Sequence, residues 1–331
     1  RQTMKIAFYA LRDFDELPLV EKYSKKYGID YVWTADGPCE GNLKLAEGCD
    51  AISATPCKMS EKWLEEWRNY GVKAVLCRSV GFDHIPMPAA QKLGLLIANT
   101  PYPANCVADY AIMLILMCLR QMQQIMKRAE AQDFSLKNKM GRDLQDLTVG
   151  VIGTGRIGQV LLKHLSGFGC RLLAYDRTQK KNVKHYAEYV DLATLYRCSD
   201  VISVHLPSNS GTFHLLDQEA FSQMKDGVII INTARGNLID SRAFIQAVKT
   251  GKIGGAGLDL LEDENGIYYH NRCGEVINND ELSMLRSFPN VIVSPHMAFY
   301  VEQTIDCMIE ENFITMDCLR NGKESPYVIN K

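Results

Sequence analysis

The stretch Thr148-Val-Gly-Val-Ile-Gly-Thr-Gly-Arg-Ile-Gly158 decides the fold. Residues 148–152 are a short run rich in Val and Ile, which is typical of a buried β-strand. Gly153, Gly155 and Gly158 follow in the spacing G-x-G-x-x-G, and helical sequence comes next. In that context the first glycine permits a tight turn, the second lets a pyrophosphate approach the backbone, and the third permits close helix packing. The stretch predicts a dinucleotide-binding turn, with a merely structural glycine turn as the alternative.

An acidic residue further along supports the same interpretation. Asp176 stands at the end of the next predicted strand, residues 171–175, where its carboxylate can accept hydrogen bonds from both hydroxyls of a ribose. The carboxylate would repel a 2′-phosphate, so the sequence predicts NAD rather than NADP. Arg177 works against this preference, because an arginine can bind a phosphate.

Short β-rich runs alternate with helical sequence twice along the chain, which predicts parallel sheets with crossover helices. The expected fold class is α/β, with two doubly wound parallel-sheet domains: a Rossmann cofactor domain and a flavodoxin-like substrate domain, with a cleft between them. We expect residues 102–299 to form the cofactor domain, and residues 4–101 with 300–331 to form the substrate domain. One long apolar helix is expected over 104–126, and an amphipathic helix over 302–320. The predicted strands are 5–10, 31–33, 51–54, 74–77 and 96–99 in the first series, and 148–152, 171–175, 201–205, 228–232, 255–259 and 291–294 in the second.

The bulk composition narrows the classes of function. A net charge of −2 over 331 residues gives no overall basic balance for binding nucleic acid. The longest apolar run, residues 110–119, is too short to span a bilayer. Eleven scattered cysteines without a CxxC pair, and no signal peptide, predict reduced thiols in the cytoplasm. No spacing of metal ligands stands out, so we expect no metal.

Three polar residues follow strands of the second series at the edge where doubly wound sheets carry their sites. Arg235 follows strand 228–232, Glu264 lies a few residues beyond strand 255–259, and His296 follows strand 291–294. Each has an ordinary alternative: a surface arginine, a solvated acid and a core histidine. Together they provide a cation for a carboxylate, an acid–base imidazole and a carboxylate to tune it.

The ordered series of motifs resembles the D-2-hydroxyacid dehydrogenase family over essentially the whole chain. Within that family it is most similar to the D-lactate dehydrogenase subgroup, because Glu264 comes five residues after Asp259 and Phe299-Tyr300 follow His296. One departure is Tyr102-Pro103-Ala104-Asn105, where the subgroup usually has Tyr-Ser-Pro-Asn. The motifs are Arg78-Ser-Val-Gly-Phe-Asp83, Gly153–Gly158 with Asp176, His205-Leu-Pro207, Asn232-Thr-Ala-Arg-Gly236, Leu258-Asp259 with Glu264, and Pro295-His296.

The resemblance implies a role for each candidate residue. Arg235 would bind the substrate carboxylate and polarise the 2-carbonyl, His296 would donate the proton, and Glu264 would stabilise the imidazolium. The amides of Val80 and Gly81 would bind the other side of the carboxylate, and Tyr102 and Phe299 would also contact the substrate. Arg156 and Ile157 would contact the pyrophosphate. The remaining cofactor contacts would come from His205, Leu206, Pro207, Thr212, Thr233, Ala234, Arg235 and Asp259.

The substrate itself is less sharply defined by the sequence. The residues expected around its side chain (Thr55, Tyr102, Phe299 and Tyr300) are aromatic or small, which predicts pyruvate or a larger apolar 2-keto acid as the small-molecule partner. Arg12 could bind a second carboxylate, so an (R)-2-hydroxyglutarate dehydrogenase is an alternative, as is a dinucleotide-sensing scaffold of the same fold. The apolar stretch 104–126, with the family resemblance, predicts a homodimer. The physiological substrate, direction and pathway stay open.

Overall fold

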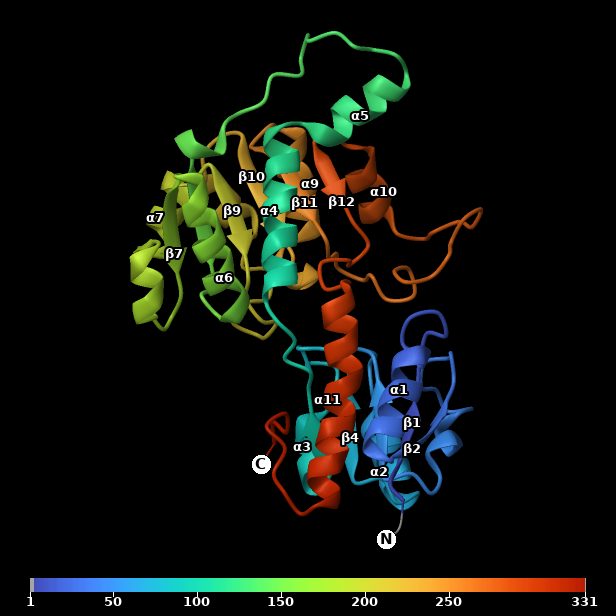
Figure 1. Ribbon diagram of the computed structural model, residues 1–331. Helices are drawn as coiled ribbons and strands as arrows, with labels where there is room; N and C mark the ends of the chain where they lie inside the picture. The colour runs from blue at the N-terminus through green and yellow to red at the C-terminus, as the bar shows by residue number, and fades with distance from the viewer. Residues whose placement is uncertain (1–2, 331) are drawn as a thin grey trace. The chain divides into compact units, whose positions relative to one another are not determined.

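The computed structural model describes residues 3–330, which divide into two compact units. One unit ends at Pro103 and resumes at Tyr300, and the other is Ala104–Phe299. Every strand pairing within the two sheets is parallel (Figure 1). This confirms the predicted α/β class with two doubly wound sheets.

The first unit has a five-stranded sheet in the order β2-β1-β3-β4-β5, which is the flavodoxin order. Helices α1 and α11 supply the buried residues on one face of the sheet, and α2, α3 and η1 supply those on the other. Its elements are β1 Lys5–Phe8, α1 Leu17–Tyr27, β2 Asp30–Trp33, η1 Leu43–Ala46, β3 Ala51–Ala54, α2 Glu61–Asn69, β4 Ala74–Cys77, α3 Met87–Lys92, β5 Leu96–Ala98 and α11 Glu302–Arg320.

The second unit has a seven-stranded sheet in the order β12-β11-β10-β9-β6-β7-β8, which is the Rossmann order with one further strand. The two-residue strand β8 at its edge was not predicted. Its strands are β6 Thr148–Ile152, β7 Arg171–Tyr175, β8 Glu188–Tyr189, β9 Val201–Val204, β10 Val228–Asn232, β11 Ile253–Leu258 and β12 Val291–Val293. Its helices are α4 Asn105–Leu119, α5 Met122–Glu130, η2 Leu144–Asp146, α6 Arg156–Leu165, η3 Ser166–Phe168, η4 Lys181–His185, α7 Leu192–Cys198, α8 Gln218–Gln223, η5 Gly236–Leu238, α9 Ser241–Lys249 and α10 Asp280–Ser287.

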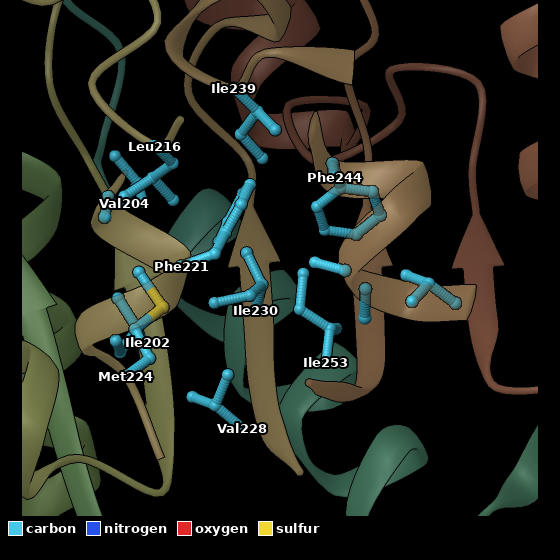
Figure 2. Close-up of a cluster of buried hydrophobic side chains, with 14 of the residues drawn as sticks. Ile202, Val204, Leu216, Phe221, Met224, Val228, Ile230, Ile239, Phe244 and Ile253 are labelled. Carbon is cyan, nitrogen blue, oxygen red and sulfur yellow. The ribbon is translucent and has the colours of Figure 1, made fainter. Parts of the chain in front are cut away.

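Strand β10 explains why this sheet needs helices on both faces. Val228 and Ile230 point into one apolar cluster, which includes Phe244 of α9 (Figure 2). Ile229 and Ile231 point into the other cluster, which α4 and α6 complete. Because side chains alternate along a strand, a run of apolar residues without interruption must be covered on both sides.

The predicted helix over 104–126 is wrong as a single element. Helix α4 ends at Leu119, Gln121 has a left-handed backbone with φ of 50°, and α5 starts again at Met122. The break is stabilised by residues further along: the amide of Arg142 donates to the Leu119 carbonyl at 3.0 Å, and the Gln121 side chain donates to the Met140 carbonyl at 2.7 Å. Within residues 3–330, no single helix is long and apolar enough to cross a membrane, and only α4 and α5 together, bent by 63°, match a span in length and composition.

Candidate active site

Parallel strands place their carboxyl ends along one edge of the second sheet, and the candidate residues of this unit follow those ends. Gly153 follows β6, Asp176 follows β7 and His205 follows β9, while Arg235 comes after β10 and His296 after β12. Ligands of doubly wound sheets bind at this edge. Neighbouring strands therefore bring residues far apart in sequence to one side of the unit.

The glycine turn has the geometry that the sequence predicts. Gly153 has a φ of 96°, and a Cβ there would lie 2.5 Å from the His205 carbonyl oxygen. A Cβ on Gly158 would lie 2.0 Å from the Gly153 carbonyl oxygen, so α6 can pack this closely only without a side chain. At Gly155 a Cβ would have no protein atom within 4 Å, which leaves that face of the turn open to a ligand. Helix α6 starts next, at Arg156 and Ile157, without a side-chain cap, so its first N–H groups can bind an anion.

Asp176 is held at the end of β7 by three hydrogen bonds. Its Oδ2 accepts from the backbone nitrogen and hydroxyl of Thr154, at 2.7 and 3.1 Å, and its Oδ1 accepts from the Thr178 amide at 3.1 Å. Partial burial opposes ionisation, but these hydrogen bonds outweigh it and lower the pKa of Asp176. Thr154 also exchanges a hydrogen bond of 2.8 Å with the Tyr189 hydroxyl. Thr154 and Tyr189 were not among the predicted site residues, although Thr154 could have been noticed as the residue between the first two glycines of the turn.

Two buried polar atoms at the same edge fit a bound dinucleotide. The Thr233 hydroxyl and the Nδ1 atom of His205 are buried, and neither has a hydrogen-bond partner within the described part of the chain. Burial lowers the pKa of His205 to about 4, so its ring is neutral at pH 7, and its Nε2 shares a 2.7 Å hydrogen bond with Ser203. Because buried polar atoms are rarely left unpaired, these two atoms at the strand edge are candidates for hydrogen bonds with a ligand. Leu206, Pro207 and Thr212 lie in the loop after β9, where the Thr212 hydroxyl donates to the Pro207 carbonyl at 2.6 Å.

His296 and Glu264 form a directly bonded pair. The His296 Nδ1 atom lies 2.7 Å from Glu264 Oε1, and both side chains are about three-quarters buried. The other oxygen, Oε2, accepts from the Leu261 amide at 3.1 Å, which orients the carboxylate. His296 has a φ of 55°, a strained conformation for a residue with a side chain. A neutral or protonated imidazole fixed in this way has its Nε2 atom available for proton transfer.

The turn that carries Arg235 packs directly onto the loop that carries Glu264. A Cβ on Gly236 would lie 2.1 Å from the carbonyl carbon and oxygen of Leu261, so this contact requires a glycine. Asn232 braces the turn, because its side chain donates to the Arg235 carbonyl at 2.8 Å and accepts from the Ala234 amide at 3.0 Å. The Asn-Thr-Ala-Arg-Gly motif thus encodes a turn that fixes the arginine's backbone beside the Glu264 loop.

Asp259 has a structural position that the sequence did not indicate. It is fully buried, and its Oδ1 accepts from the Ser294 hydroxyl at 2.6 Å and the Met297 amide at 2.8 Å. Its Oδ2 accepts from the Ala298 amide at 2.9 Å. These bonds hold the turn on both sides of His296. The cofactor contact expected from Asp259 stays a prediction.

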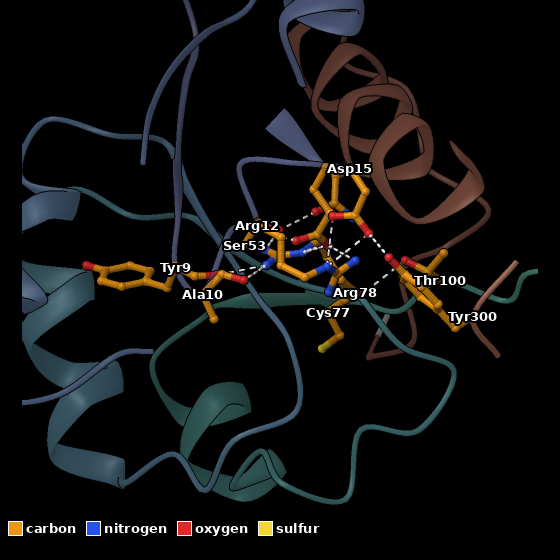
Figure 3. A network of polar contacts seen from close by, with 11 residues as sticks. Tyr9, Ala10, Arg12, Asp15, Ser53, Cys77, Arg78, Thr100 and Tyr300 are labelled. Atoms are coloured by element: carbon orange, nitrogen blue, oxygen red, sulfur yellow. Dashed lines mark hydrogen bonds and ion pairs between the residues drawn. The ribbon is translucent and has the colours of Figure 1, made fainter. Parts of the chain in front are cut away.

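The first unit holds a different set of candidates, anchored by Arg78. Its guanidinium is buried and donates to Glu16 at 3.0 Å, to Ser53 at 3.0 Å, and to the carbonyls of Tyr9 and Ala10 at 2.8 and 2.9 Å (Figure 3). A buried pair of this kind costs about 3–5 kcal/mol to break by removing one partner. The network fixes the start of the loop that follows β4.

That loop contains Val80 and Gly81. Ser79 donates to the Gly81 carbonyl at 2.6 Å, and the Asn99 side chain donates to the Val80 carbonyl at 2.7 Å. The carbonyls of the loop are thus bound within the protein, whereas its amides are the groups expected to bind a carboxylate. Tyr102 lies in the segment after β5, before the chain enters the second unit. Among residues 3–330, no group of three or more His, Cys, Asp or Glu side chains could hold a metal ion.

Comparison with known proteins identifies the family to which the chain is similar. Residues 112–298 match the family model described as D-isomer specific 2-hydroxyacid dehydrogenase, NAD binding domain. The aromatic 2-oxoacid reductase of Clostridium sporogenes is 38% identical over 314 residues, 93% of each chain. The D-lactate dehydrogenase of Escherichia coli is 35% identical over 326 residues, 98% of this chain and 99% of the relative. The solved structure of a D-2-hydroxyisocaproate dehydrogenase matches with a TM-score of 0.88 and 32% identity, covering 99% of this chain and all of that one.

The match covers more than half of the chain in the family model and nearly all of it in the relatives. The glycine turn with Asp176, and the open face at Gly155, also fit NAD in this structure. The chain therefore belongs to the D-isomer specific 2-hydroxyacid dehydrogenase family, and it is an NAD-dependent oxidoreductase that interconverts D-2-hydroxy acids and 2-keto acids.

Proposed function

We propose that this enzyme reduces pyruvate or larger apolar 2-keto acids, with Arg235, Glu264 and His296 as its catalytic set. The observation that carries the proposal is the 2.7 Å contact between His296 and Glu264, on a loop packed against the Arg235 turn. A cation, an acid–base group and its carboxylate partner are thus brought to one edge of one sheet. Those are the groups needed to reduce a carbonyl next to a carboxylate.

His296 transfers the proton, and Glu264 binds the imidazole that carries it. Glu264 accepts the Nδ1 proton, so the mobile proton of the imidazolium is on Nε2, and His296 donates it to the carbonyl oxygen of the substrate. The neutral ring takes the proton back in the reverse direction. Glu264 stabilises the charged ring during proton transfer, because a hydrogen bond between two charged groups is stronger than one between neutral groups.

Arg235 orients the substrate. Its planar guanidinium binds a carboxylate with two parallel hydrogen bonds and places a positive charge beside the adjacent carbonyl oxygen. We also propose that the amides of Val80 and Gly81 bind the substrate and that their unit, the first, is the substrate domain. Tyr102 and Phe299 contact the rest of the substrate.

The second unit, proposed as the cofactor domain, holds NAD at its strand edge. Gly155, Arg156 and Ile157 bind the pyrophosphate at the start of α6, and Asp176 accepts from the ribose hydroxyls. His205, Leu206, Pro207, Thr212, Thr233, Ala234 and Asp259 complete the proposed contacts. When bound as NADH, the cofactor supplies the hydride.

The structure favours an apolar substrate over 2-oxoglutarate. Arg12 donates to the carboxylate of Asp15 at 2.8 Å and lies 3.4 Å from that of Glu16, which also binds Arg78. Two cations thus face two carboxylates, so the group has no net positive charge for a distal carboxylate, and the Arg12 Nη2 atom, which has no hydrogen-bond partner within the described residues, still lies 3.4 Å from Glu16. The named substrate of the Clostridium sporogenes relative, an aromatic 2-oxoacid, agrees with this direction. We therefore rank the (R)-2-hydroxyglutarate activity second, and a dinucleotide-sensing scaffold third because the catalytic set is complete.

We also propose a homodimer, with a different surface from the one expected. Seven residues of α4 are buried within its own unit, so its apolar face is already covered. Helix α5 has no buried residue, and Met126, Phe134, Leu136 and Met140 in and after it are more than half exposed. A second copy of the chain would cover this exposed segment, residues 122–140. We place the enzyme in the cytoplasm, where its eleven free thiols would stay reduced.

The proposal is tested with a panel of 2-keto acids at a fixed, saturating NADH concentration. We expect turnover of pyruvate, 2-oxobutyrate, 4-methyl-2-oxopentanoate and phenylpyruvate, and a D configuration in each product. A preference for 2-oxoglutarate would contradict the apolar pocket. NADH binding without turnover of any acid would favour the scaffold.

A further inference from the structure

A third aromatic ring lies against the proposed acid–base residue. The ring centroid of Tyr269 is 5.7 Å from that of His296 and 6.2 Å from that of Phe299. His296 and Phe299 are themselves 6.0 Å apart. All three rings are thus in mutual contact, and Phe299 meets each of the other two edge-on, an arrangement that aromatic rings favour.

The loop that supplies Glu264 also supplies Tyr269. The Glu264 carbonyl accepts from the amides of Ile267 and Tyr268, at 3.1 and 3.3 Å, and this turn directs the chain back toward His296. The Tyr269 hydroxyl then donates to the His296 carbonyl at 3.0 Å. One short loop therefore holds His296 at two points, its Nδ1 atom through Glu264 and its backbone through Tyr269.

The ring of Tyr269 is fixed but largely uncovered. Its φ of 67° is an unusual backbone conformation for a tyrosine, and its side chain is held by the hydroxyl bond and the two ring contacts. Even so, Tyr269 is 62% exposed, whereas the neighbouring Tyr268 is 9% exposed. Tyr268 packs in the interior of the unit, whereas Tyr269 presents a rigid apolar face directly beside the imidazole of His296.

We propose that Tyr269 is a specificity-determining residue, which binds the side chain of aromatic 2-keto acids on its exposed ring. The inference rests on the proposed role of His296 as proton donor to the C2 carbonyl. Arg235 binds the carboxylate on C1, so the side chain that begins at C3 is directed away from the arginine. Tyr269 and Phe299 are the aromatic residues in contact with His296 among the ring pairs of the described chain. A phenyl group stacked on Tyr269 would gain apolar contact that a methyl group cannot make.

The test compares two substrates in three forms of the intact enzyme. We would measure kcat/KM for phenylpyruvate and for pyruvate, at saturating NADH, in wild type, Tyr269→Phe and Tyr269→Ala. Tyr269→Ala should lower the phenylpyruvate-to-pyruvate ratio by about tenfold, because it removes the ring. Tyr269→Phe keeps the ring and loses only the bond to His296, so both substrates should fall by a similar factor of about three to five and the ratio should stay within about twofold.

Other results would overturn the proposal. If Tyr269→Ala lowers kcat/KM equally for both acids, the tyrosine only positions His296. If the ratio changes as much in Tyr269→Phe as in Tyr269→Ala, the hydroxyl and not the ring selects the substrate. If Tyr269→Ala does not fold, Tyr269→Leu replaces it, and a smaller fall in the phenylpyruvate-to-pyruvate ratio is expected. Wild type inactive on both acids would instead refute the proposed function, a result distinct from an active enzyme with an unchanged ratio.

Discussion

The contact between Glu264 and His296 predicts how Glu264→Gln would change the rate and the pH dependence of keto-acid reduction. Glu264→Gln keeps the size of the side chain and an oxygen that can still accept from Nδ1, but it removes the negative charge. The protonated imidazole loses its counter-charge while the neutral imidazole loses little. Reduction, which needs the protonated ring, should therefore lose activity at neutral pH, and its profile should move toward acid.

The structure sets the size of the effect. Hydrogen bonds to charged groups contribute about 1.5–3 kcal/mol and neutral ones about half as much. At 2.7 Å the pair is at the strong end, but 28% exposure of His296 and 21% of Glu264 let water weaken it. The glutamine also retains a neutral hydrogen bond. We expect a loss of about 1–2 kcal/mol, which is about five- to thirtyfold in kcat/KM for reduction at pH 7.

The assay is kcat/KM for keto-acid reduction from pH 5 to 9, with the oxidation of the hydroxy acid measured alongside. Glu262 provides a matched control, because it lies in the same loop and makes an equivalent contact of 2.6 Å with His214 instead of His296. Glu262→Gln should leave the pH profile in place. A profile that does not move in Glu264→Gln, or that moves equally in Glu262→Gln, would show that the carboxylate does not tune His296.

Three further outcomes follow from the same geometry. Wild type should prefer NADH to NADPH by about tenfold or more across pH 5–9, since hydrogen bonds lower the pKa of Asp176 and keep its carboxylate ionised. Asp176→Ala should reduce that preference, measured as the ratio of kcat/KM for the two cofactors. Arg235→Lys should lose nearly as much kcat/KM as Arg235→Gln, and retention of most wild-type activity would refute two-pronged binding of the carboxylate. Arg12→Ala should leave the low 2-oxoglutarate-to-pyruvate ratio unchanged, because Arg12 is already bound to Asp15 and Glu16, whereas a selective loss of 2-oxoglutarate turnover would restore the dicarboxylate alternative.

Much of the fold could be predicted because buried parallel strands leave a strong local signal. The runs at 148–152, 171–175 and 228–232 match β6, β7 and β10 residue for residue, and the predicted helix 302–320 has the bounds of α11. Asp240 caps the start of α9, where its side chain accepts from the amides of Arg242 and Ala243. Such elements are specified by their own apolar pattern and caps, so sequence alone is enough.

The errors fall where distant contacts decide the backbone. Nothing within residues 104–126 indicates that the helix ends at Leu119. The contact that stabilises this end comes from outside the segment, since the Leu119 carbonyl accepts from the amide of Arg142, more than twenty residues further on. Strand β8 consists of two residues whose pairing with β7 defines it. In both cases the local sequence is compatible with another structure, and the tertiary contact selects one.

The proposed catalytic residues could be selected as a set from the sequence, but the residues that support them could not. His296, Glu264 and Arg235 could be found because each follows a strand end and each has a chemical role to match. The family resemblance also implied a cofactor contact for Asp259, and that contact stays a prediction. What the sequence did not reveal is that three hydrogen bonds of Asp259 go to residues 294–298, where they hold the left-handed turn at His296.

That arrangement has a physical reason. A residue with a φ of 55° does not keep that conformation by local preference. It needs contacts that would be lost if the turn relaxed. Those contacts come from the buried carboxylate of Asp259, just after β11, and from a glutamate and a tyrosine in the loop that follows. The candidate catalytic residues can be recognised in the sequence from their positions after strands. The residues that hold the reactive turn in place become visible only once the backbone amides and carbonyls they bind are known.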